Sequence, residues 1–150
     1  MKIGAFVPQG WRMDLNGISV EDQWNTIISS AKNIENLNYE SIWVYDHFHT
    51  VPKPTQDSTF ECWTLMSALS QNTSKVRLGQ MCTCNSYRNP SYLTKVASNI
   101  DVISGGRLEY AIGAGWYDHE YKAYGYDYPS AGVRLKMLEA GEVNAKQIDK

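Results

Sequence analysis

The sequence predicts an α/β fold in which parallel strands alternate with helices. Four short, nearly continuous apolar segments recur along the chain, as is typical of strands buried on both faces. Each is followed by a loop and then by a segment with helical signals. Repeated strand–helix units imply a parallel sheet with right-handed crossovers. Four units form half of a (β/α) TIM-type barrel, because a complete barrel takes about 250 residues and this chain has 150.

Local signals place the elements. Ser19 is expected to cap the first helix, Pro90 suits the first turn of the third helix, and Gly105-Gly106 ends that helix. The predicted strands are residues 3–7, 41–45, 76–83 and 107–112. The predicted helices are residues 20–37, 59–71 and 90–104, and one that begins near residue 131. No linker divides these elements, so we expect a single domain over residues 1–150.

Composition narrows the function classes. Hydrophobic residues make up 43% and charged residues 20% of the chain, as in ordinary globular proteins. The net charge of −2 provides no basic surface for nucleic acid, and no apolar run approaches the roughly 18 residues that span a bilayer. The N-terminus enters a strand without the pattern of a secretory signal. Three cysteines without framework spacing suit a reducing compartment, so we expect a cytoplasmic protein.

The ends of the predicted strands carry the candidate site, because barrel enzymes place their chemistry at the C-terminal edge. Asp46 and His47 end the second strand. An imidazole there can donate or accept a proton near neutral pH, and Asp46 could orient its ring. The alternative is that Asp46 caps the following loop beside a structural histidine.

Two more strand ends add candidates for ligand contact. Met81, Cys82, Thr83 and Cys84 end the third strand, with both cysteines on one face. Two thiols without a matching pair do not make a zinc set, so no metal is expected. Gly113 and Gly115 lack the spacing of a dinucleotide fingerprint and suit close approach of backbone to a ligand.

Other candidates have a structural alternative. Arg88 could bind an anionic group or simply cap and pack. The aromatic residues Trp11, Trp116 and Tyr117 could line a substrate pocket or serve in packing.

Six segments, taken in order, carry a family resemblance. They are FVPQGWR (6–12), SIWVYDHF (41–48), RLGQMCTC (77–84), YRNP (87–90), DVISGGR (101–107) and GAGWY (113–117). The set resembles the bacterial-luciferase-like monooxygenase family, in particular its coenzyme F420 (deazaflavin)-dependent oxidoreductases. Family members resemble complete barrels about twice this length, so this chain is similar to their first half.

The resemblance implies hydride transfer between the deazaflavin and an unknown small organic substrate. His47 would lie by the coenzyme ring, and the coenzyme-binding set would be Met81, Cys82, Thr83, Cys84, Arg88, Gly113 and Gly115, with a non-proline cis peptide within Met81–Cys84. Trp116 occupies the place of a carboxylic acid found in some deazaflavin enzymes of the family. Alternatives are an FMN monooxygenase that uses oxygen, or a non-catalytic half barrel that self-associates.

The resemblance weakens after residue 139. Ala140–Lys150 does not continue the family pattern, and Gly141 is expected to break the helix that begins near residue 131. The missing second half would supply much of the coenzyme's phosphate contacts, so a truncated chain with weak or absent activity is expected. Open sheet edges favour pairing, so a homo-oligomer is expected as well.

Overall fold

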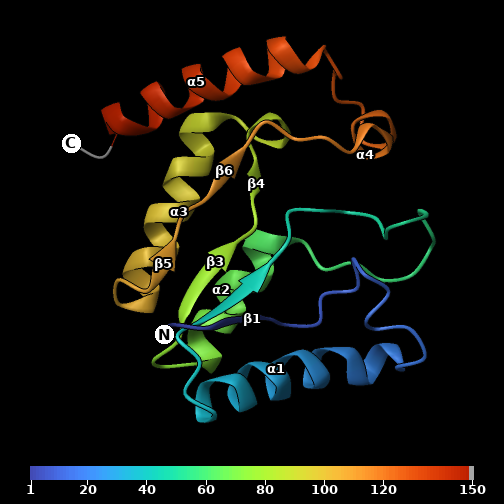
Figure 1. The fold of residues 1–150 in the computed structure, drawn as a ribbon, viewed down its shortest axis with the longest axis vertical. Coiled ribbons are helices and arrows are strands. Elements are labelled where there is room, and N and C mark those ends of the chain that lie inside the picture. The colour runs from blue at the N-terminus through green and yellow to red at the C-terminus, as the bar shows by residue number, and fades with distance from the viewer. Residues whose placement is uncertain (149–150) are drawn as a thin grey trace.

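The computed structural model describes the backbone of residues 1–148 and the side chains of residues 1–141. Strands β1 (Gly4–Phe6), β2 (Ser41–Val44), β3 (Arg77–Gln80) and β5 (Leu108–Glu109) form a parallel sheet in that order. Strands β4 (Thr83–Cys84) and β6 (Ile112–Gly113) form a second parallel pair. Helices α1 (Val20–Asn36), α2 (Cys62–Asn72) and α3 (Pro90–Ser104) connect the strands (Figure 1). The predicted parallel half barrel is confirmed.

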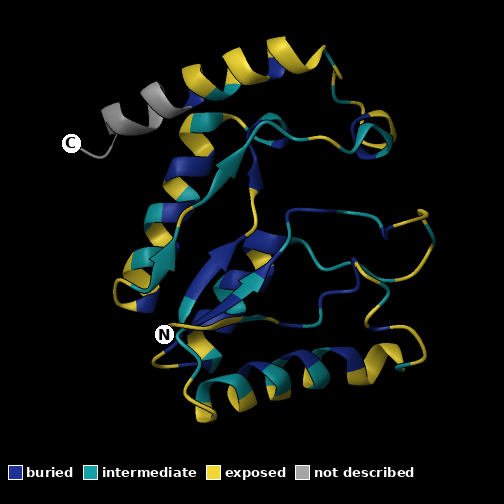
Figure 2. Cartoon of the chain, in the orientation of Figure 1, coloured by how far each residue is buried: buried dark blue, intermediate teal, exposed yellow. Residues whose placement is uncertain are grey.

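The core lies between the sheet and these three helices. Ile42, Val44 and Leu78 of the strands are fully buried, and they belong to one cluster with residues of α1, α2 and α3 (Figure 2). The helical members of this cluster include Ile27, Ala31, Met66, Leu69, Leu93, Ala97 and Ile100. Burial of apolar surface contributes about 25 cal/mol per Å² to the free energy of folding. The buried residues on one side of each helix therefore hold that helix against the sheet.

The other face of the sheet carries Trp43, whose indole covers two glycines. A Cβ added to Gly79 would lie 2.6 Å from Trp43 Cε3, and one added to Gly4 would meet the same indole. The indole nitrogen donates to Ser41 Oγ at 2.8 Å. Phe6 on this face is 45% exposed. The glycines are therefore needed so that Trp43 can lie against the strands.

Two predicted strands are each divided in two. The predicted strand 76–83 becomes β3 and β4, on either side of a cis peptide bond between Met81 and Cys82. The predicted strand 107–112 becomes β5 and β6. After these breaks β4 and β6 pair with one another, with Thr83 opposite Ile112, rather than extending the main sheet. The expectation of a non-proline cis bond within Met81–Cys84 is confirmed at its first bond.

Several helix ends differ from expectation. Ser19 does occupy the N-cap of α1, but its hydroxyl donates to the Asp22 carboxylate at 2.7 Å instead of capping a backbone amide. Helix α2 begins at Cys62 rather than near Thr59, because the Glu61 carboxylate accepts the amide protons of Trp63 and Thr64. Pro90 and Gly105 bound α3 as predicted.

The last part of the chain is more helical than predicted. A short helix, α4 (Asp118–Ala123), lies in the aromatic loop that follows β6. Helix α5 (Ala131–Ile148) begins as predicted but continues through Gly141, so the expected break there is wrong. A Cβ at Gly141 would collide with the Asn85 side chain, whose amide donates to Met137 O at 3.1 Å. Gly141 thus allows close packing of α5 on η1 (Asn85–Tyr87) instead of ending the helix.

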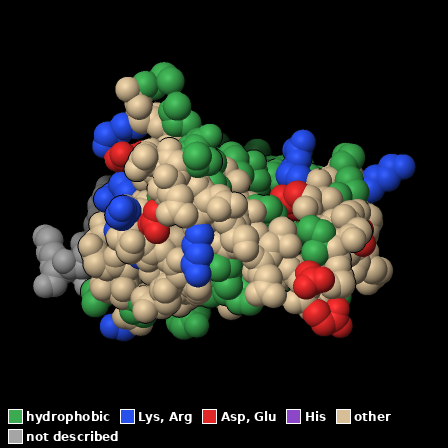
Figure 3. All heavy atoms as spheres, turned by 90° about the horizontal axis from the view of Figure 1, so that it is seen from below, with side chains coloured by type: hydrophobic (Ala, Val, Ile, Leu, Met, Phe, Trp, Pro, Cys, Tyr) green, Lys and Arg blue, Asp and Glu red, His purple; other side chains and the backbone are tan. Residues whose placement is uncertain are grey.

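The surface shows no concentration of one charge on the face seen from below. There Lys, Arg, Asp and Glu side chains are scattered among polar and hydrophobic ones (Figure 3). None of the helices in the described residues combines the length and apolar character required to cross a membrane.

We predict that Gly79→Ala destabilises the fold, whereas Gly132→Ala does not. The new methyl group at residue 79 would overlap the Trp43 ring, and overpacking of this kind costs about 1–3 kcal/mol. Gly132 lies in α5 with open space around its Cα, where alanine is favoured by about 0.5–1 kcal/mol. Urea unfolding of both variants measures the difference. Equal free energies of unfolding would contradict the assigned position of Trp43.

Candidate active site

A cavity of about 330 Å³ lies at the C-terminal edge of the strands. Its lining comes from three strand ends that are far apart in sequence: Asp46 and His47 after β2, Met81, Cys82 and Cys84 around β4, and Gly113, Ala114 and Gly115 at the end of β6. Tyr87 and Trp116 complete it. The predicted strand-end residues therefore meet at one edge, as the parallel topology requires.

His47 is fixed within this cavity by its neighbours. Its ring stacks on Trp11 with centroids 4.5 Å apart and planes 2° from parallel, and Trp116 and Tyr117 contact it edge-on. Nδ1 lies 2.9 Å from Oε2 of Glu120. This pairing leaves Nε2 as the ring nitrogen available to a ligand in the cavity. The aromatic candidates Trp11, Trp116 and Tyr117 thus all contact His47.

Glu120 is a fully buried carboxylate that comes from α4. Its Oε1 accepts the amide protons of Phe48 at 2.6 Å and His49 at 2.9 Å, and its Oε2 accepts the Tyr87 hydroxyl at 2.7 Å. Burial alone would raise the pKa of Glu120, but His47, the His49 amide and the Tyr87 hydroxyl outweigh it and lower the pKa below the usual value of 4.5. Glu120 is therefore an ionised acceptor beside the imidazole.

Asp46 has different partners from those predicted. Its carboxylate accepts two hydrogen bonds from Arg88, at 2.7 and 2.9 Å, and the amide proton of Cys84 at 2.7 Å. No hydrogen bond or ion pair joins the side chains of Asp46 and His47 among the described residues, so the expected orienting role of Asp46 is not supported. Asp46 instead ties the end of β2 to β4 and to the segment that precedes α3.

Arg88 is likewise a structural residue in this geometry. It forms ion pairs with Asp46 and with Glu61, at 2.6 Å, and it does not line the cavity that contains His47. Its two carboxylate partners account for its charge, so the expected contact with an anionic coenzyme group is not supported.

Thr83 does not line the cavity either. It is fully buried and pairs with Ile112.

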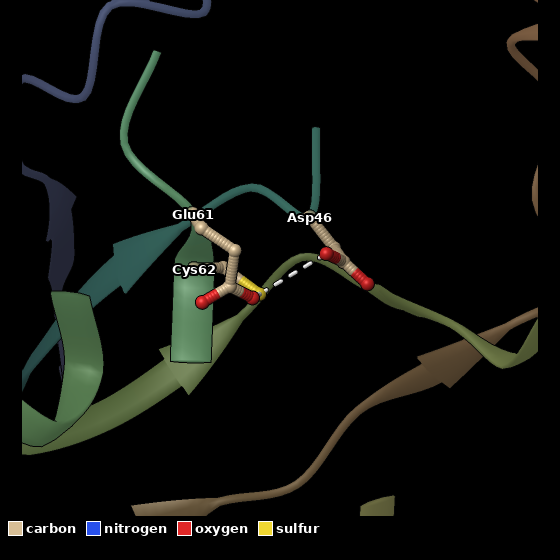
Figure 4. Close-up of side chains that lie close together, drawn as sticks. All are labelled: Asp46, Glu61 and Cys62. Carbon is tan, nitrogen blue, oxygen red and sulfur yellow. Dashed lines mark hydrogen bonds between the residues drawn. The ribbon is translucent and has the colours of Figure 1, made fainter. Parts of the chain in front are cut away.

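One group of side chains has the composition of a cation site. Asp46, Glu61 and Cys62 present ligand atoms within 4.8 Å of one another (Figure 4). The Arg88 guanidinium already binds both carboxylates. Burial, together with Asp46, raises the pKa of the Cys62 thiol well above its usual value, so the thiolate that a metal requires is disfavoured. The chemistry of the group is that of a buried ion pair.

Two contributors to the site had no clear sequence signal. Glu120 lies 73 residues after His47, in a segment predicted to be a loop. Gln9 is also buried. Its side-chain oxygen accepts the amide proton of Tyr45, and its side-chain nitrogen donates to the carbonyls of Tyr45 and Phe60, each at 2.7 Å.

The fold and the site define the class of a (β/α)-barrel protein with a candidate site at the ends of its strands. The family described as luciferase-like monooxygenases matches residues 1–138, and the chain belongs to that family. Pyrimidine monooxygenase RutA of Serratia proteamaculans is 26% identical over 130 residues, covering 83% of this chain and 35% of that protein. RutA of Agrobacterium fabrum is 27% identical over 131 residues, covering 83% and 36%.

Solved structures show the same architecture. An F420-dependent secondary alcohol dehydrogenase, in complex with an F420–acetone adduct, superimposes with a TM-score of 0.78 at 26% identity, covering 97% of this chain and 41% of that one. The FMN complex of the oxygenating constituent of 3,6-diketocamphane monooxygenase from Pseudomonas putida gives 0.78 at 19% identity, covering 99% and 39%. The latter likeness concerns the fold alone. The chain thus spans well under half the length of these proteins.

We predict that Arg88→Met destabilises the protein far more than Lys2→Met. Removing Arg88 leaves the buried Asp46 carboxylate without its counter-charge, which costs about 3–5 kcal/mol. Lys2 pairs with Glu40 on the surface, where an ion pair is worth at most about 1 kcal/mol. Urea unfolding measures both losses. An Asp46→Asn/Arg88→Met double variant should lose less than the sum of its single variants; full additivity would contradict direct coupling.

Proposed function

We propose that this chain supplies the coenzyme-ring half of a deazaflavin-dependent oxidoreductase site, in which a hydride passes between coenzyme F420 and a small organic substrate. The observation that carries the proposal is the position of His47. It lines the strand-end cavity, and its Nδ1 is already engaged by Glu120. The 26% identity to an F420-dependent dehydrogenase supports the choice of coenzyme.

The residues present fit a planar, mostly apolar ring. Trp116, 58% exposed, and Met81, 47% exposed, offer apolar surface at the cavity. Gly113 has no side chain at this wall, where a Cβ would lie in contact with Cys82 Cβ at 3.4 Å. Ligand pockets range from about 300 to 1,000 Å³, and 330 Å³ is near the lower limit. The cavity therefore suits the ring of the coenzyme, and contacts to its phosphate-bearing tail would come from elsewhere.

Each residue would have a limited task. When bound, the deazaflavin supplies the hydride chemistry. His47 would accept or donate the accompanying proton at Nε2, which is the free ring nitrogen. Trp11 holds the imidazole plane by stacking. Gly113 and Cys82 would allow backbone and small side chains to approach the ring. Tyr117, whose hydroxyl donates to Thr50 O at 3.2 Å, closes the site against the loop after β2.

An FMN-dependent monooxygenase is the alternative enzyme. It is supported by the RutA relatives, which are named as pyrimidine monooxygenases. A third candidate is a half barrel without turnover, which would retain neither coenzyme.

The purified chain should bind F420 with micromolar affinity or weaker, and FMN less tightly. Absorbance and fluorescence titrations with each coenzyme measure this. Cys82→Trp would fill the strand-end cavity and should weaken binding at least about tenfold, equivalent to about 1.4 kcal/mol. Asn99→Trp is the matched control, because it fills a second groove between α2 and α3 and should leave the dissociation constant unchanged.

The outcomes of the titrations separate the candidates. Tighter binding of FMN would favour the monooxygenase alternative, and retention of neither coenzyme would favour the non-catalytic half barrel. Loss of binding in Asn99→Trp but not in Cys82→Trp would place the coenzyme in the other groove and refute the assigned site.

Self-association is a further part of the proposal. Within the described residues β1 pairs with β2 on one edge and leaves its other edge unpaired. Ile3 and Phe6 beside that edge are 48% and 45% exposed, and such edges favour pairing with another chain. Sedimentation velocity over a hundredfold concentration range should show a rise in average mass; a constant monomer mass would contradict self-association.

A further inference from the structure

The carboxylate of Glu120 has its hydrogen-bonding capacity filled. It is fully buried, and an ionised carboxylate has roughly four acceptor positions on its two oxygens. The amides of Phe48 and His49 occupy Oε1. Nδ1 of His47 and the hydroxyl of Tyr87 occupy Oε2. The carboxylate therefore has one fixed orientation, set by donors from two separate segments of the chain.

The geometry determines which ring nitrogen of His47 carries the proton. A carboxylate only accepts hydrogen bonds, so Nδ1 at 2.9 Å from Oε2 must be the donor. In the neutral imidazole one nitrogen donates and the other accepts. Nε2 is then the lone-pair nitrogen, and it is the one left to the cavity. Asp46 does not compete for this role, because Arg88 and the Cys84 amide engage its oxygens.

We propose that Glu120 is a positioning residue, which holds His47 as the Nδ1–H tautomer and so presents Nε2 to the cavity as a proton acceptor. Trp11 fixes the plane of the ring, whereas Glu120 fixes its rotation and its tautomer. The group received at Nε2 is therefore one that donates a hydrogen bond or a proton. This role rests on the proposed function for the identity of the bound ligand, but the tautomer itself is a property of the chain alone.

Glu120→Gln separates positioning from a purely structural role. The carbonyl oxygen of the introduced glutamine would still accept the amides of Phe48 and His49, so the loop remains tied. Its amide group would face Nδ1 as a donor, which requires Nδ1 to become the acceptor. The proton is therefore expected to move to Nε2, so that the imidazole would present a donor to the cavity.

Long-range ¹H–¹⁵N NMR of histidine rings reads the tautomer directly and needs no coenzyme. At a pH high enough that the ring ¹⁵N signals no longer change with pH, the wild-type His47 ring should show a protonated Nδ1 and an unprotonated Nε2. Glu120→Gln should reverse the assignment. Tyr87→Phe, which keeps the contact between Nδ1 and Glu120, and Asp118→Asn, at a half-exposed residue of the same helix, should both retain the wild-type pattern. His49→Gln and His119→Gln assign the signals.

Several results would overturn the inference. A wild-type ring protonated at Nε2 refutes it without any variant, even if Glu120→Gln fails to fold. An unchanged tautomer in a folded Glu120→Gln, or a reversed one in Asp118→Asn, refutes it as well. Absence of coenzyme binding combined with the expected tautomers would instead refute the proposed function and leave the role of Glu120 intact.

Discussion

The buried carboxylate of Glu120 is the interaction on which the arrangement of the site depends. This side chain belongs to α4. It accepts hydrogen bonds from two backbone amides after β2, from Nδ1 of His47 and from the hydroxyl of Tyr87. A buried charge is tolerated only when donors surround it, so these segments must meet at one point. Because the buried charge of Glu120 needs these donors, it restricts the conformation of the loop that carries His47.

Asp46 imposes a second constraint beside the first. It joins the end of β2 to the amide of Cys84 and to Arg88, whose guanidinium also reaches the N-cap residue of α2, Glu61. The two adjacent residues Asp46 and His47 therefore have different partners. Both residues line the cavity, but the Asp46 carboxylate binds Arg88 and the Cys84 amide, whereas the His47 ring binds Glu120. A residue that holds the structure, Asp46, is therefore directly followed in the sequence by the residue proposed to handle the proton, His47.

The pattern of the sequence determined much of the fold but only part of the site. Buried-strand composition around Ile42 and Leu78 and helix boundaries at Pro90 and Gly105 were sufficient for the order of elements and the parallel sheet. Because parallel strands end at one edge, the convergence of His47, Cys82 and Gly113 followed from topology.

The partners of Asp46 and His47 could not be predicted from the sequence, because Arg88 and Glu120 are 42 and 73 residues away. The sequence pattern also did not reveal the role of Gly141, because its intrinsic helix cost is offset by a tertiary contact with Asn85.

Mapping of bound coenzyme by NMR tests most directly whether the strand-end cavity is the coenzyme site. Amide and histidine-ring signals of the ¹⁵N-labelled chain would be followed during titration with F420 and, separately, with FMN. We expect the largest shifts at the amides of Cys82, Gly113 and Gly115 and at Nε2 of His47, with little change along the α2–α3 groove near Tyr92 and Asn99. Shifts confined to that groove, or none at millimolar coenzyme, would contradict the assignment of the site.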